Sequence, residues 1–120
     1  MSRDLPRAQY DDIEFDDQLA LLEGAPFTGV IYANHPDGGL ELEYNYAEGL
    51  PSGIQRQWYR GGQLEKEWDA VRGKGSVWSR QWHPNGVLKY ERINDENGLA
   101  SRIREWSEDG RLLSDTASTG

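Results

Sequence analysis

The residues of this chain that could carry chemistry are two histidines and a series of regularly spaced carboxylates. His35 and His83 could act as acid–base groups or metal ligands, and neighbouring acids such as Glu65 and Glu67 could work together as general acid and base. The chain has no cysteine, which excludes disulfides and thiolate metal sites. Whether these side chains form a site depends on where the fold places them.

The elements that position these residues repeat along the chain every 24 residues. Each copy carries a glycine followed two residues later by a leucine, and three copies also carry an arginine and a tryptophan at constant offsets. A fixed period in four copies indicates a tandem-repeat fold. The marker residues are Gly38 and Leu40, Gly62 and Leu64, Gly86 and Leu88, Gly110 and Leu112, with Arg56 and Trp58, Arg80 and Trp82, and Arg104 and Trp106.

Each repeat glycine closes a predicted turn. In the third repeat, His83-Pro84-Asn85-Gly86 has the residue order of a type I turn followed by a left-handed glycine, which joins antiparallel strands through a three-residue loop. Further glycines between the repeats turn the chain back again. The sequence therefore predicts an all-β fold: an antiparallel meander of four tandem β-hairpins, about eight strands, forming a twisted single sheet with no long helix.

The three-residue loop also predicts a register. It pairs Trp82 with Leu88 and then, without interruption, Arg80 with Tyr90. A two-residue loop would pair Arg80 with Glu91, but it needs a backbone N–H that Pro84 lacks. In the chosen register the large apolar side chains share one face with Arg56, Arg80 and Arg104, which we expect to stack on aromatic rings. An acidic column then occupies the other face, formed by Glu43, Glu67, Glu91 and Asp115, with Glu41 and Glu65 beside it.

This architecture predicts no active site. His35 and His83 are two repeats apart, which is four strands or roughly 19 Å in a flat sheet, so we expect them to open turns rather than share a metal. The paired acids resemble a hydrolase arrangement, but no second layer is predicted to form a cleft around them. We expect no enzymatic activity, no cofactor and no small-molecule substrate.

The charge distribution favours a basic protein as the partner. The net charge is −8, and the first 24 residues hold seven acids against Arg3 and Arg7. Such a chain is repelled by nucleic acid and by anionic membranes, so neither is an expected partner. With no apolar leader and no run of transmembrane length, a cytoplasmic location is expected.

Three regions are predicted along the chain. Residues 1–23 form an acidic segment that is either a degenerate hairpin or a short amphipathic cover, with the first nine residues frayed. Residues 24–115 form the repeat domain, and residues 116–120 form a disordered tail.

The glycine–leucine hairpin with an aromatic residue ahead of its turn resembles the MORN repeat (membrane occupation and recognition nexus). It is more similar to the bacterial variant of that repeat in the YwqK-like antitoxin family. Residues 24–30 (GAPFTGV) look like that family's opening motif, and the similarity continues through residue 113. The chain departs from the pattern at Arg72-Gly73-Lys74-Gly75, where the glycine is shifted.

The resemblance implies an immunity protein, or antitoxin, that binds and neutralises a cognate bacterial toxin, commonly a basic one that acts on nucleic acid. The alternative is a MORN-type scaffold for protein or lipid binding. The acidic column is either ordinary solvated surface or the surface that meets a basic toxin. The expected partner-binding residues are Glu41, Glu43, Glu65, Glu67 and Glu91 of the sheet and Asp11, Asp12, Asp16 and Asp17 of the N-terminal segment.

Overall fold

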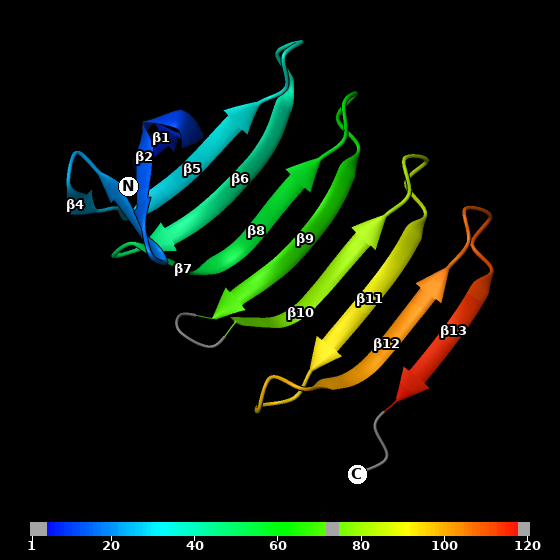
Figure 1. Cartoon of the computed structure of the whole chain (residues 1–120). Helices are drawn as coiled ribbons and strands as arrows, with labels where there is room; N and C mark the ends of the chain where they lie inside the picture. Colours follow the sequence, from blue (N-terminus) through cyan, green and yellow to red (C-terminus); the bar gives the residue numbers. More distant parts are fainter. Residues whose placement is uncertain (1–4, 72–74, 118–120) are drawn as a thin grey trace, which may run out of the picture.

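The computed structural model describes residues 5–71 and 75–117, and within them the chain is almost entirely β-structure (Figure 1). The single helical element of those ranges is one 3-10 turn, η1 (Tyr10–Asp12). The prediction of an all-β meander is confirmed. The departure of the repeat pattern at residues 72–74 and the tail from residue 118 onward lie outside the described residues.

Ten strands form one open sheet that does not close into a barrel. Eight of them make the four predicted hairpins, which follow one another across the sheet: β5 (Gly29–Asn34) and β6 (Leu40–Ala47), β8 (Gly53–Trp58) and β9 (Leu64–Val71), β10 (Gly75–Trp82) and β11 (Leu88–Asn94), β12 (Ala100–Trp106) and β13 (Leu112–Ala117). The two short additions are β1 (Arg7–Gln9), which runs parallel to β5, and β7 (Leu50–Pro51), which pairs with β6.

The four hairpin turns have the same hydrogen bonds. In the third, the His83 N–H donates to the Val87 carbonyl at 2.8 Å, and the Gly86 N–H donates to the His83 carbonyl at 2.9 Å. Gly86 has φ of +90°, a conformation that glycine adopts without strain. Equivalent bonds close the turns that begin at His35, Tyr59 and Ser107. The predicted three-residue loop is therefore confirmed.

The register beyond the turn differs from the prediction because every hairpin contains a β-bulge one residue after its leucine. Trp82 pairs with Leu88 as expected, but Gln81 pairs with Tyr90, so Lys89 is left without a cross-strand partner. Arg80 consequently pairs with Glu91, and the predicted pairing with Tyr90 is wrong. The residues inserted in the four hairpins are Glu41, Glu65, Lys89 and Leu113.

The bulge changes which residues share a face, because one inserted residue moves all later side chains of that strand to the other side. Arginines and acids alternate strand by strand in a single row, which we call the charge ladder. The tryptophans two residues from the arginines lie on this same face, so the prediction that they lie opposite the acids is wrong. The ladder comprises Glu43, Arg56, Glu67, Arg80, Glu91, Arg104 and Asp115.

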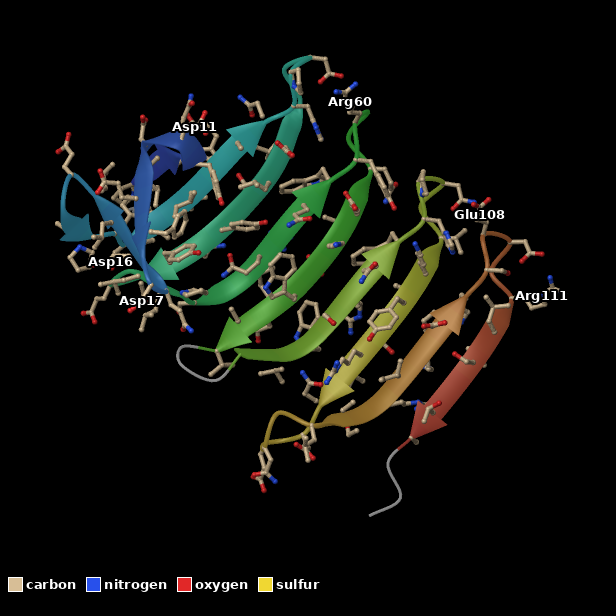
Figure 2. All side chains as sticks on the ribbon, in the orientation of Figure 1. Asp11, Asp16, Asp17, Arg60, Glu108 and Arg111 are labelled. Atoms are coloured by element: carbon tan, nitrogen blue, oxygen red, sulfur yellow. The ribbon has the colours of Figure 1, made fainter. Side chains whose placement is uncertain are left out.

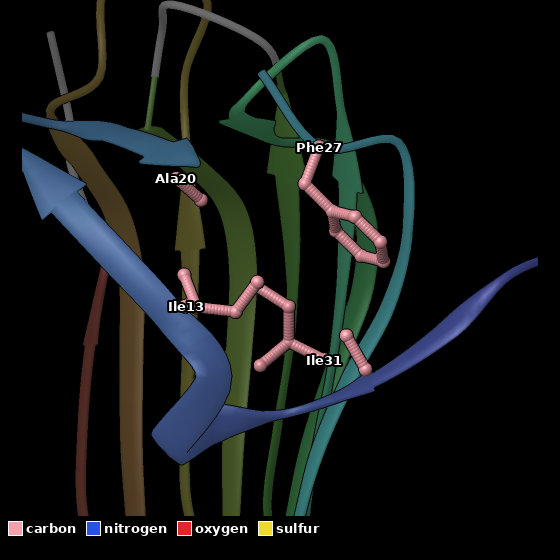
Figure 3. Packing of buried hydrophobic residues seen from close by; sticks show 5 residues of the cluster. Ile13, Ala20, Phe27 and Ile31 are labelled. Carbon is pink, nitrogen blue, oxygen red and sulfur yellow. The ribbon is translucent and has the colours of Figure 1, made fainter. Parts of the chain in front are cut away.

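The main core lies at the N-terminal end of the sheet, between the first hairpin and a second, three-stranded sheet (Figure 3). That sheet consists of β2 (Ile13–Asp16), β3 (Leu19–Leu22) and β4 (Ala25–Pro26), and together with η1 we call it the N-terminal cover. It packs on Ile31, which pairs with Tyr44 and therefore points away from the ladder face. The cluster contains Ala8, Ile13, Ala20, Phe27 and Ile31, with Leu22, Tyr44 and Tyr46 against it.

The acidic segment forms the β2–β3 hairpin of the cover, and two boundaries differ from those expected. Residues 7–9, expected to be frayed, form β1 and pair with β5. The last repeat continues to Ala117 as β13 rather than ending at residue 115. Both extensions are held by cross-strand pairing to a neighbouring strand, which the local sequence does not display.

Gly49 attaches the cover to the sheet. Its N–H donates to the Phe27 carbonyl, and its carbonyl accepts from the Ala20 N–H, both at 2.8 Å. A Cβ at this position would lie 2.7 Å from Cδ1 of Leu19, and φ is +83°. Only a residue without a side chain allows this close approach.

Candidate functional site

The charge ladder is held together by ion pairs between neighbouring strands. Arg56 Nε lies 2.7 Å from Glu67 Oε2, and Arg80 Nε lies 2.9 Å from Glu91 Oε2. Arg104 binds the second carboxylate oxygen of Glu91, so this carboxylate serves two arginines. At the ends of the row, Arg7 pairs with Glu43 at 3.0 Å and Arg102 pairs with Asp115 at 2.9 Å.

Glu91 is the most enclosed acid of the ladder, with 6% of the residue exposed. Hydrogen bonds from Arg104 lower the pKa of its carboxyl group most, burial acts in the opposite direction, and Arg80 lowers the pKa further. The pKa of Asp115 is likewise lowered, chiefly by Arg102. These acids therefore stay ionised as partners of arginines within the sheet.

This geometry corrects the predicted acidic column. Four ladder carboxylates face five arginines, so the row carries no excess negative charge. Glu43, Glu67 and Glu91 are thus already paired, and a basic partner would have to compete for them. Glu41 and Glu65 lie outside the ladder, as the inserted residues of the first two bulges.

The N-terminal acids are placed differently. Asp11 and Asp12 belong to η1, Asp16 ends β2 and Asp17 lies in the turn after it; all four are exposed. None of them forms an ion pair with another residue of the described ranges. Asp11, Asp16 and Asp17 lie on the cover, at the opposite end of the molecule from Glu108 and Arg111 of the last turn (Figure 2). Because the cover packs on the face of the sheet opposite the ladder, the structure does not combine these acids with Glu43, Glu67 and Glu91 into one surface.

Two exposed aromatic residues lie among these cover acids. The rings of Tyr10 and Phe15 pack 5.6 Å apart, and the residues are 41% and 43% exposed. Phe15 also contacts Tyr46 of the sheet at 6.5 Å between ring centroids. The cover thus presents a partly exposed aromatic pair, with exposed carboxylates next to it in the sequence.

Each of the two histidines joins its own turn to the next hairpin by a hydrogen bond. His35 Nε2 lies 2.9 Å from the Trp58 carbonyl, and His83 Nε2 lies 2.9 Å from the Trp106 carbonyl, so each Nε2 carries the proton that it donates. Tyr59, at the same repeat position, donates its hydroxyl to the Trp82 carbonyl at 2.8 Å. The sequence shows the shared position ahead of the turn, but not the contact, which joins residues 23 apart on different hairpins. Within residues 5–71 and 75–117, no three His, Asp or Glu side chains are grouped as metal ligands would be.

Aromatic side chains remain partly exposed on both faces beyond the cover. On the ladder face, Arg80 lies 4.5 Å from the Trp78 ring and Arg104 lies 5.2 Å from the Trp106 ring, which confirms the predicted stacking for these two arginines. On the opposite face, Tyr44 packs against Trp68 at 5.7 Å. None of the five tryptophans is fully buried. Figure 1 shows why: past the first hairpin the described chain is one layer thick.

A pocket of about 370 Å³ lies between the third and fourth hairpins. Tyr90 and Leu113 supply apolar walls, and Lys89 and Glu105 supply opposite charges. Glu105 and Tyr90 are paired across β11 and β12, next to the ladder row, so they face away from the ladder.

Comparison with known proteins leaves the family open. No family model matches the chain, and no curated protein matches it either. A solved structure described as "Crystal structure of GtfA/B complex bound to UDP and GlcNAc" aligns with 88% of this chain at 13% identity and a TM-score of 0.38. The aligned part is 23% of that protein's own chain, and a likeness at this level carries no argument about activity. No helix in the described part of the chain is long and apolar enough to cross a membrane.

Proposed function

We propose that this chain is an immunity protein that binds a basic toxin domain in the cytoplasm and neutralises it. The observation that carries the proposal is the surface of the N-terminal cover, where the tilted rings of Tyr10 and Phe15 pack together, partly exposed, on a segment whose exposed aspartates form no ion pair in the described ranges. The resemblance of the repeats to the MORN-variant antitoxins supports the same function.

The cover has the composition of a protein-binding surface. Exposed aromatic residues are typical anchors of interfaces because they bury a large area at little cost in side-chain entropy. Unpaired carboxylates at the rim raise the association rate with a positively charged partner. Asp11, Asp12, Asp16 and Asp17 therefore become the preferred contact residues, ahead of the ladder acids that already bind arginines.

Neutralisation requires binding alone. An acidic protein surface seated on the basic cleft of a toxin excludes nucleic acid from that cleft, because both present negative charge to the same cationic side chains. The proposal assigns the chain no catalytic residue and no cofactor. The sheet acts as the rigid support that holds the cover in place.

The test is co-expression of this chain with the product of the adjacent gene. Cell survival and a purified complex that suppresses the partner's activity on nucleic acid would support the proposal. A pair that fails to associate, or a complex in which the partner stays active, would contradict it.

The contact surface is tested by replacing Asp11 and Asp12 with lysine and measuring the rate of association with the toxin at several salt concentrations. We expect the rate at low salt to fall by about tenfold or more, with a weaker dependence on salt. The matched control reverses Glu96 and Glu108, two exposed turn acids away from the cover. Equal effects of the two double variants would place the contact elsewhere.

A further inference from the structure

The outer edge of β13 is not paired with any strand of the described chain. β13 pairs with β12 on one side only, and all six of its residues are exposed, with Leu112 at 49% and Leu113 at 60%. An uncovered edge presents backbone donors and acceptors that readily pair with another strand. At the other end of the sheet the edge strand is β1, which is three residues long, and η1 follows it directly.

The junctions between hairpins show which residue an added strand would need. At each of the three junctions, an acid on the second strand of one hairpin faces an arginine on the first strand of the next. The pairs are Glu43 and Arg56, Glu67 and Arg80, and Glu91 and Arg104. Asp115 is the fourth member of this acidic series, 24 residues after Glu91. It lies on the edge strand with no described strand opposite.

Asp115 binds Arg102 through both carboxylate oxygens, at 3.0 and 2.9 Å, and each oxygen keeps a second lone pair that can accept a hydrogen bond from another cation. Glu91 shows that a carboxylate of this row binds two arginines at once, with Arg80 on one oxygen and Arg104 on the other. The side chain of Asp115 is also more accessible, at 32% exposed against 8% for Glu91.

We propose that an extended segment of a basic partner protein adds to β13 as the next strand and places an arginine or lysine opposite Asp115. This inference rests on the proposed function, since it gives the same partner a second contact at the end of the sheet opposite the cover. The pocket lined by Tyr90 and by Leu113 of β13 lies on the face away from the ladder and receives a neighbouring side chain of the segment. A second copy of this chain fits poorly, because antiparallel pairing of two β13 strands brings their two Asp115 carboxylates close together.

The probe is a synthetic peptide with the sequence of residues 99–107, because its Arg104 faces Glu91 at the junction inside the protein. It is titrated into the isotope-labelled full chain, and hydrogen exchange and chemical shifts of residues 112–117 are followed by NMR. We expect new protection of these amides. Asp115→Ala in the protein should weaken peptide binding by about tenfold, and Glu108→Ala in the adjacent turn should leave binding unchanged. Alanine in place of Arg104 in the peptide gives the same test on the unaltered protein.

The inference fails if the peptide leaves residues 112–117 unprotected, or protects them equally in the Asp115→Ala variant. Protection that appears without peptide and increases with protein concentration would identify a second copy as the occupant, and would also overturn it. The proposed function is assessed separately. A toxin that is neutralised while the β13 amides stay exposed in the complex refutes the added strand alone, whereas a partner that is never neutralised refutes the function alone.

Discussion

Replacing Glu91 with glutamine should destabilise the sheet more than the same change at any other ladder position. The Glu91 carboxylate accepts hydrogen bonds from two arginines, and its side chain is 8% exposed. A hydrogen bond to a charged group contributes roughly 1.5–3 kcal/mol. Arg80 and Arg104 are 36% and 30% exposed, so water replaces part of the lost hydrogen bonding. We therefore expect Glu91→Gln to lower the free energy of unfolding by about 2–3 kcal/mol in total.

Two other ladder acids provide an internal scale. Glu67 binds one arginine and its side chain is 17% exposed, so Glu67→Gln should cost about 1 kcal/mol. Glu43 is 26% exposed and its partner Arg7 is 48% exposed, so Glu43→Gln should cost less than about 0.5 kcal/mol. The order of the three effects follows burial and the number of bound arginines.

The measurement is urea unfolding at neutral pH, followed by tryptophan fluorescence, with the midpoint and the m-value compared for each variant.

The pKa of Glu91 is lowered in the folded state, so its stabilisation is present above the unfolded pKa of about 4.3 and is lost as the pH falls through the folded value. The free-energy difference between wild type and Glu91→Gln should therefore shrink in acid. Three equal effects below about 0.5 kcal/mol would refute the ladder and favour a solvated acidic column.

The other predictions concern the cover, the attachment of the turns and the bulge. Gly49→Ala should lower the free energy of unfolding by about 2 kcal/mol or more, because the added Cβ meets Leu19 and φ is positive. Hydrogen exchange should show the loss of protection in the cover, and unchanged protection there would contradict this prediction. Tyr59→Phe should cost about 1 kcal/mol by removing the bond to the Trp82 carbonyl, whereas a stability equal to wild type in thermal unfolding would show that the bond is dispensable. Deleting Lys89 removes a bulge and moves the rest of β11 to the wrong face, so circular dichroism and size-exclusion chromatography should show an unfolded or aggregated chain.

Much of the architecture follows from the sequence alone. The glycine period predicts four hairpins, and the order His83-Pro84-Asn85-Gly86 predicts the loop type, because only certain residues adopt the backbone angles of that turn. The pairing of Trp82 with Leu88 follows directly from the loop. These features are local: the residues that determine each turn are the residues within it.

The faces of the sheet were decided by tertiary structure. The four bulge residues are two glutamates, a lysine and a leucine (Glu41, Glu65, Lys89 and Leu113), so no common residue type marks the insertion. The bulge instead aligns each acid with arginines on neighbouring strands, and that gain arises only when the hairpins lie side by side. The cover likewise depends on Ile13, Ala20 and Phe27 meeting Ile31, a contact between segments that are separate in sequence. Which of the predicted acids are already bound to arginines therefore became apparent only once the strands were assembled.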